Sequence, residues 1–69
     1  MILSEEEKQN LINYCDKVID EHIDLIKYLI TDEERDPDYQ RSGVIASCYM
    51  VNSYNNMKSR VEAGLPALP

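Results

Sequence analysis

The sequence predicts an all-α fold, an antiparallel helical hairpin that oligomerises into a helical bundle. Apolar residues recur with helical spacing in both halves of the 69-residue chain, and a short acidic segment with a proline separates the halves. A chain of this length buries only about 60% of its unfolded surface, so a single hairpin has marginal stability. Self-association is therefore expected, and one hairpin domain is expected to span residues 1–69.

The first helix is predicted over about residues 4–33. Ser4 and Glu7 have the spacing of a capping box, in which the serine hydroxyl accepts from the glutamate amide and the glutamate side chain reaches back. Apolar or buried-type residues then alternate at spacings of three and four, which gives the helix one broad apolar face. They are Ile12, Cys15, Ile19, His22, Ile26 and Leu29.

The second helix is predicted over about residues 37–62. Pro37 disfavours helical geometry at Asp36 and fits a first helical position, so Asp36 is expected to be the N-cap. Gly64 predicts the helix end, and residues 64–69 are expected to form an extended tail. Because the connection is only a few residues long, the helices are expected to be antiparallel neighbours.

The second helix carries two apolar stripes, which one partner helix cannot cover. The first stripe contains Val44, Cys48 and Val51, and the second contains Met50, Tyr54, Met57 and Val61. We therefore expect this helix to contact more than one neighbour. Facing residues in the hairpin should have numbers that sum to about 70, which places His22 near Cys48.

Cys15 and Cys48 are predicted to be two buried free thiols. In the expected register they lie about 10 Å apart along the helix axis, too far for a disulfide. His22 is expected to be buried and hydrogen-bonded across the bundle, which would make assembly pH-sensitive. One histidine and one cysteine do not complete a metal site, so no metal and no cofactor are expected.

Catalysis is not expected from this sequence. Asp20 and Asp24 are paired carboxylates, but no reactive side chain accompanies them, and they are typical of a solvated helix face. With glycines only at positions 43 and 64, the chain also has no glycine-rich phosphate loop. The residues favour a binding protein over an enzyme.

Charge is divided unevenly along the chain. Twelve of the thirteen carboxylates lie within residues 1–38, and the net charge is −6. This charge disfavours binding to extended DNA or RNA. The sequence lacks a run of about 20 apolar residues, so no membrane segment is expected, and the absence of a secretion-signal pattern favours a cytoplasmic location.

The acid-poor second half is rich in tyrosine, asparagine and cations, which suits nucleotide binding. Tyrosine rings stack on bases, and arginine forks match phosphate oxygens. The alternative is that these residues pack in an oligomer interface, where tyrosine and arginine are also enriched; both hold if a ligand lies between subunits. The candidate ligand-binding residues are Arg41, Tyr49, Asn52, Tyr54, Asn55, Lys58 and Arg60, assisted by Lys27 and Tyr14.

Residues 3–66 resemble the phage anti-defence helical-hairpin sponge proteins, which act against CBASS and Thoeris defence. The resemblance lies in the acidic first helix, in Asp38-Tyr39-Gln40-Arg41 opening the second, and in Arg60-Val61-Glu62-Ala63 closing it. It implies a non-enzymatic oligomer that sequesters a cyclic oligonucleotide signal in the host cytoplasm, with Arg41 and Arg60 at matching positions. The tryptophan and the Gly-Phe-Met stretch frequent in that family are absent.

Two other functions are open on sequence grounds. The carboxylates of the first helix could imitate a phosphate backbone and occupy a basic host protein, as an acidic inhibitor of the anti-CRISPR or nucleic-acid-mimic type does. The chain could also be a plain dimerisation module without a ligand.

Overall fold

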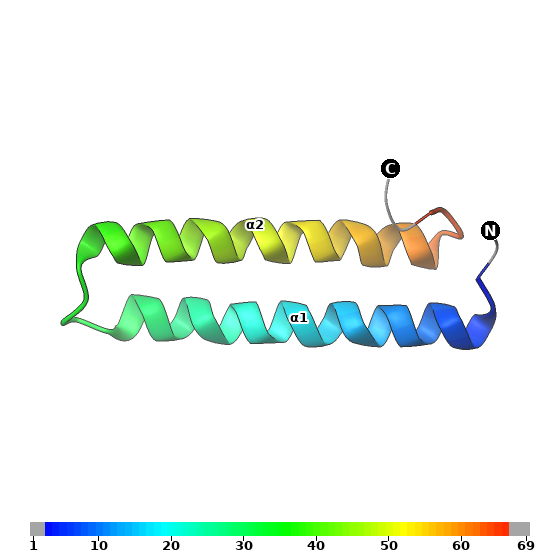
Figure 1. The fold of residues 1–69 in the computed structure, drawn as a ribbon, viewed down its shortest axis with the longest axis horizontal. Coiled ribbons are helices and arrows are strands. Elements are labelled where there is room, and N and C mark those ends of the chain that lie inside the picture. The colour runs from blue at the N-terminus through cyan, green and yellow to red at the C-terminus, as the bar shows by residue number, and fades with distance from the viewer. Residues whose placement is uncertain (1–2, 67–69) are drawn as a thin grey trace.

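The fold is a hairpin of two long antiparallel helices lying side by side (Figure 1). The computed structural model describes residues 3–66, with α1 at Glu5–Thr31 and α2 at Pro37–Glu62. This part of the chain contains no strand. The predicted all-α hairpin is confirmed, although the first helix is shorter than the predicted span of about 4–33. The predicted tail is described only through residue 66, and residues 67–69 lie outside the described range.

A capping box begins α1 as predicted. The Ser4 hydroxyl accepts a hydrogen bond from the Glu7 amide at 3.1 Å, and the Glu7 carboxylate accepts from the Ser4 amide at 3.1 Å. The Ser4 amide is the main reason that the pKa of Glu7 is lowered. These bonds satisfy two amides that the helix leaves without intrahelical acceptors.

The turn is fixed by side chains at the start of α2. The Asp36 carboxylate caps α2 by accepting from the Asp38 amide at 3.0 Å, and Pro37 takes the first helical position. Across the hairpin, the Gln40 amide group donates to the carbonyl oxygens of Leu29 at 2.6 Å and Asp32 at 2.5 Å. Gln40 thereby ties the start of α2 to the end of α1.

Gly64 ends α2 in a left-handed conformation, with φ of 77°. The Leu65 amide donates to the Arg60 carbonyl at 2.8 Å, and the Gly64 amide donates to that of Val61 at 3.1 Å. This pair of bonds is a Schellman motif, which needs a residue that tolerates positive φ. The predicted glycine stop is confirmed.

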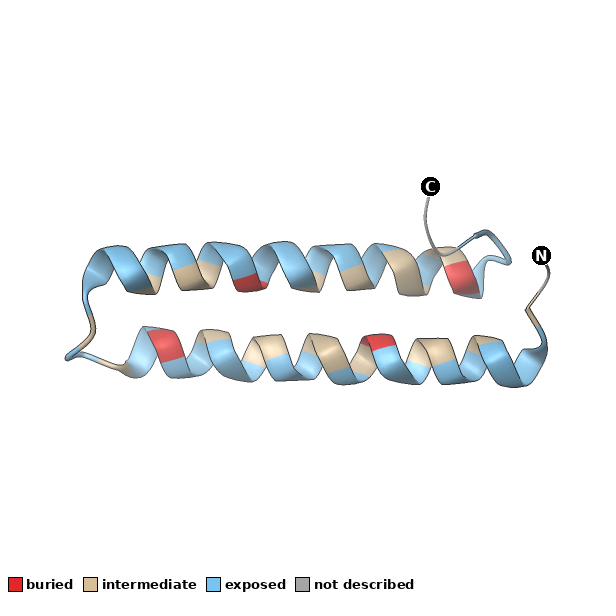
Figure 2. Ribbon diagram, in the orientation of Figure 1, coloured by how far each residue is buried: buried red, intermediate tan, exposed pale blue. Residues whose placement is uncertain are grey.

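The hairpin has a narrow core between its two helices (Figure 2). Within residues 3–66, the fully buried side chains are Cys15, Leu29, Ser47 and Val61. A Cβ built on Gly43 would lie 2.7 Å from Leu29 Cδ1, so the absence of a side chain there lets the helices approach closely near the turn. The molecule measures 48 × 20 × 13 Å, which is the shape of a single layer of helices.

The prediction of a buried thiol is right for Cys15 and wrong for Cys48. Cys15 is fully buried, and burial raises the pKa of its thiol. Cys48 is exposed, because its neighbour Ser47 occupies the inward position on α2. The side chain of His22 is half-buried, and its Nδ1 is buried without a hydrogen-bond partner. Within the described hairpin, the predicted cross-bundle bond is therefore missing at this nitrogen.

Candidate functional site

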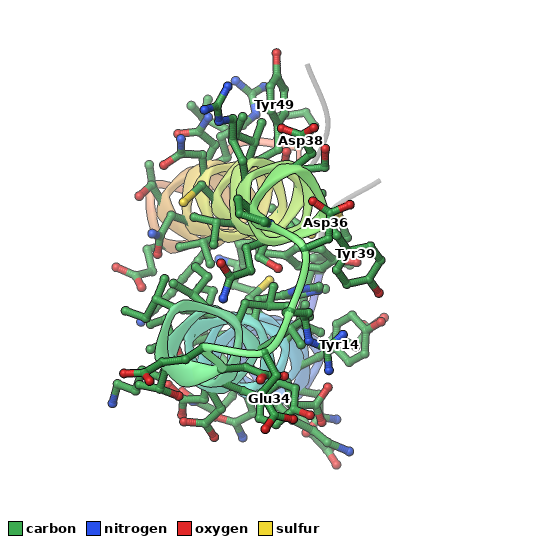
Figure 3. All side chains as sticks on the ribbon, turned by 90° about the vertical axis from the view of Figure 1, so that its left-hand side faces the viewer. Tyr14, Glu34, Asp36, Asp38, Tyr39 and Tyr49 are labelled. Atoms are coloured by element: carbon green, nitrogen blue, oxygen red, sulfur yellow. The ribbon has the colours of Figure 1, made fainter. Side chains whose placement is uncertain are left out.

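Four of the five tyrosines lie on one side of the hairpin, which we call the tyrosine side. On α1, helical spacing places Tyr14, Leu25 and Tyr28 along one side, about one to four turns apart. Figure 3 shows Tyr14 of α1 and Tyr39 of α2 on the same side of the two helices. The exposed members are Tyr14, Leu25, Tyr28, Tyr39 and Met50, and the half-buried Tyr54 completes the surface. Burying apolar surface away from water lowers the free energy. An exposed aromatic side on a hairpin with so small a core therefore marks a surface suited to binding.

A cation–π cluster lies at the turn end of this side. The guanidinium carbon of Arg35 is 5.1 Å from the ring centre of Tyr28 and 5.2 Å from that of Tyr39. Arg35 Nε donates to Asp32 Oδ2 at 2.9 Å, and its Nη2 donates to the Tyr28 hydroxyl at 2.9 Å. The hydrogen bond to Asp32, followed by that to Tyr28, raises the pKa of Arg35. The cluster orders both tyrosines next to a permanent positive charge.

A pair of tyrosines lies farther from the turn. The rings of Tyr14 and Tyr54 have centroids 6.0 Å apart and cross at 63°, an edge-to-face arrangement that favours aromatic contact. The adjacent Tyr14 hydroxyl is the main reason that the pKa of Tyr54 is raised. Because Tyr14 is 53% exposed, part of its ring remains free for another aromatic group.

Lys58 is committed to an ion pair between the helices. Its Nζ lies 2.7 Å from Asp16 Oδ1 and 4.0 Å from Glu62 Oε1. The hydrogen bond to Asp16 is the first cause of the raised pKa of Lys58. Arg60 is also engaged, because its Nε donates to the Pro66 carbonyl at 2.7 Å. Both cations were expected to bind a ligand, and in the hairpin each already has an acceptor.

The structure does not gather the nine predicted ligand-binding residues into one cluster. Tyr14 and Tyr54 meet, and Lys58 lies between the helices nearby. Tyr49 is 74% exposed and points away from α1 (Figure 3). Arg60 is half-buried near the C-terminal end of α2. The other four are exposed and fall, by helical position, on the side opposite the tyrosines; they are Lys27, Arg41, Asn52 and Asn55.

Sequence reasoning missed Tyr28, Leu25 and Arg35 as parts of the candidate site. A signal for the first two was present. Tyr14, Leu25 and Tyr28 fall at positions i, i+11 and i+14, which lie along one side of an α-helix. Arg35 gave no such signal, because its placement depends on the geometry of the turn.

The arrangement defines a class, a small helical hairpin with one exposed aromatic side. No protein-family model matches the chain, and neither a curated protein nor a solved structure matches it. Across residues 3–66, no group of three or more histidine, cysteine or acidic residues is placed to hold a metal ion. In the same range, neither helix is long and apolar enough to cross a membrane.

Proposed function

We propose that this chain is a non-enzymatic binding protein that works as a homo-oligomer and sequesters a cyclic nucleotide signal between its subunits. The proposal follows the resemblance to anti-defence sponge proteins and includes their setting, the cytoplasm of a phage-infected host. The single observation that carries it is the tyrosine side, an aromatic surface that the hairpin leaves exposed.

The chemistry of that side suits a nucleotide base. Stacking of a base on an aromatic side chain contributes about 1–3 kcal/mol, and it does not require a particular base. The Tyr14–Tyr54 pair offers such a ring with a fixed orientation. A ligand held between two copies would receive rings from both, so that two bases of one cyclic nucleotide could each stack on a tyrosine.

Calorimetric titration with cyclic dinucleotides, cyclic trinucleotides and cyclic ADP-ribose isomers tests the ligand. The proposal predicts heat with at least one of them, and Tyr14→Ala should weaken that binding at least tenfold. Tyr49→Ala is the comparison variant, because Tyr49 lies outside the tyrosine side, and it should retain binding. Absence of heat with every ligand rejects the nucleotide proposal, and a loss confined to Tyr49→Ala places the ligand on the outer surface of α2.

A second candidate, the acidic inhibitor, is favoured by a different observation. Asp20, Glu21 and Asp24 are exposed on α1, and within the described residues they form no ion pair. Figure 3 shows three further carboxylates, those of Glu34, Asp36 and Asp38, spread along the turn end of the hairpin from α1 to α2. If this surface occupies a basic host protein, replacing residues 20, 21 and 24 by lysine should abolish capture of that protein.

The two candidates predict different results for the same variants. An Asp20→Lys/Asp24→Lys variant, which keeps Glu21 on the tyrosine side unchanged, should weaken capture of a basic protein and leave nucleotide binding in place, while Tyr14→Ala should leave that capture in place. A chain that passes neither test, yet still self-associates, is a plain dimerisation module.

A further inference from the structure

From its shape, size and charge, we infer that the tyrosine side is covered by a second copy of this chain, in a two-fold dimer whose turns lie at the same end. This inference rests on the proposed homo-oligomer and specifies its geometry. In the dimer, α1 of each copy lies antiparallel over α2 of the other, which makes a four-helix bundle with antiparallel neighbours.

The hairpin exposes more surface than a compact monomer of its size. The hairpin exposes 5362 Å², whereas a compact monomer of 8.0 kDa exposes about 4,500 Å². The excess of about 900 Å² is close to the roughly 800 Å² that each partner contributes to a standard protein interface. The radius of gyration is 14.9 Å, compared with about 11 Å for a compact domain of this length, so the hairpin resembles half of a bundle.

The stripes of α1 and α2 that would meet in the dimer carry side chains of complementary size. On the tyrosine side, the same helical spacing gives α1 the stripe Tyr14, Lys17, Glu21, Leu25 and Tyr28, in which Tyr14, Leu25 and Tyr28 are the large apolar or aromatic members. The matching stripe of α2 runs at i, i+3, i+7, i+11, i+14 and i+18, and it alternates large residues with small ones. Its members are Tyr39, Ser42, Ala46, Met50, Ser53 and Met57.

The hairpin register decides which residues would meet. Leu29 lies against Gly43, and Tyr14 lies against Tyr54, so facing residues have numbers that sum to about 70. With both turns at one end, α1 of the second copy keeps this register over α2 of the first. Tyr28 then lies over Ser42, and Leu25 lies over Ala46, so large side chains meet small ones as close packing requires.

The arrangement with turns at opposite ends fits less well. It would stack α1 on α1 and α2 on α2. In the register that sets Leu25 against Asn10, Tyr14 and Tyr28 would lie against the carboxylates of Glu21 and Glu7 instead of against small residues. Charge also opposes it, because α1 carries seven acidic and three basic residues, while α2 carries two acidic and three basic residues. Pairing α1 with α2 brings opposite net charges together, whereas pairing α1 with α1 joins two helices of charge −4.

Disulfide trapping between variants that each carry one exposed cysteine tests the geometry. Each variant carries Cys48→Ser, since Cys48 is the exposed native thiol and Cys15 is buried. Leu25→Cys protein is mixed with Ala46→Cys protein and oxidised, and the inference predicts a covalent mixed dimer. The matched control replaces Ala46→Cys by Ile45→Cys, which is exposed at almost the same height but on another side of α2.

The mixed dimer should form at least tenfold faster with Ala46→Cys than with the control. Equal rates overturn the inference. Rapid trapping of Leu25→Cys with Asn10→Cys also overturns it, because that contact belongs to the arrangement with turns at opposite ends. Native mass spectrometry of the reduced wild type separates the two levels: a monomer rejects the proposed oligomer, whereas an oligomer with the wrong trapping pattern rejects only this geometry.

Discussion

Lys58 Nζ lies 2.7 Å from Asp16 Oδ1, and within the described residues this is the ion pair that joins α1 to α2. The contact fixes the register in the half of the hairpin away from the turn, as Gly43 and Leu29 fix it near the turn. Both groups remain partly exposed, and exposed ion pairs contribute little to stability. The pair therefore sets the register of the two helices and adds little to the free energy of unfolding.

The first prediction concerns pH and this ion pair. The raised pKa of Lys58, caused first by the Asp16 hydrogen bond, stabilises the fold fully below the ordinary lysine pKa of about 10.4. This contribution is lost as pH rises through the higher folded-state pKa. Urea melts of wild type and Asp16→Asn should differ by a constant amount between pH 7 and 9, and the difference should begin to shrink as pH rises above the ordinary lysine pKa. A difference that grows with pH contradicts the assignment.

The second prediction concerns the unpaired nitrogen of His22. Its Nδ1 is buried without a partner, and an unsatisfied buried polar group costs about 1–3 kcal/mol. His22→Leu removes that group and should raise the free energy of unfolding by about 1 kcal/mol, measured by urea melts at pH 7.5. His22→Gln is the control, because it keeps a polar group at this position and should not stabilise. If His22→Leu destabilises, the nitrogen has a partner in the oligomer.

The third prediction uses the close approach of Gly43 and Leu29. Alanine favours a helix over glycine by about 1 kcal/mol, but a Cβ at position 43 would lie 2.7 Å from Leu29 Cδ1, and Leu29 is 3% exposed. Gly43→Ala should therefore destabilise wild type and stabilise a Leu29→Ala background. A double-mutant cycle measured by thermal melts gives the coupling. Equal effects in both backgrounds would show that the helices do not meet at this point.

Most of the fold could be predicted from local chemistry. The capping box at Ser4, the cap at Asp36 and the stop at Gly64 each act within a few residues, so the sequence displays them directly. The helix bounds consequently agree well. Gln40, which ties α2 to α1, was not foreseen, because its acceptors are carbonyl groups that only the turn geometry brings within reach.

The candidate site was harder to predict because it depends on which side of each helix faces its neighbour. The two apolar stripes of α2 left that choice open, and the prediction of a buried Cys48 followed the wrong one; the structure turns Ser47 inward instead. Residue type alone then grouped Tyr49 with Tyr54, although these side chains point in different directions. Helical spacing shows which residues share a side of a helix, but it identifies the exposed side only once the side that faces the other helix is known.

The fourth prediction concerns salt. Each chain carries a net charge of −6, so self-association brings like charges together, and added salt screens that repulsion. Sedimentation velocity at fixed protein concentration should show stronger association at 300 mM NaCl than at 20 mM. Tyr28→Lys, which places a charge on the tyrosine side, should weaken association at both salt concentrations. Ile30→Lys is the comparison on the opposite side, and an equal loss there would mean that both sides are interfaces.

Native mass spectrometry of freshly purified protein tests the central claim most directly, because it reports subunit number and retained ligand together. The account predicts a multiple of the 8.0 kDa chain mass, with additional mass equal to a bound nucleotide when the protein is purified from cells that make the signal. A species at the mass of one chain, without additional mass at any protein concentration, would contradict it.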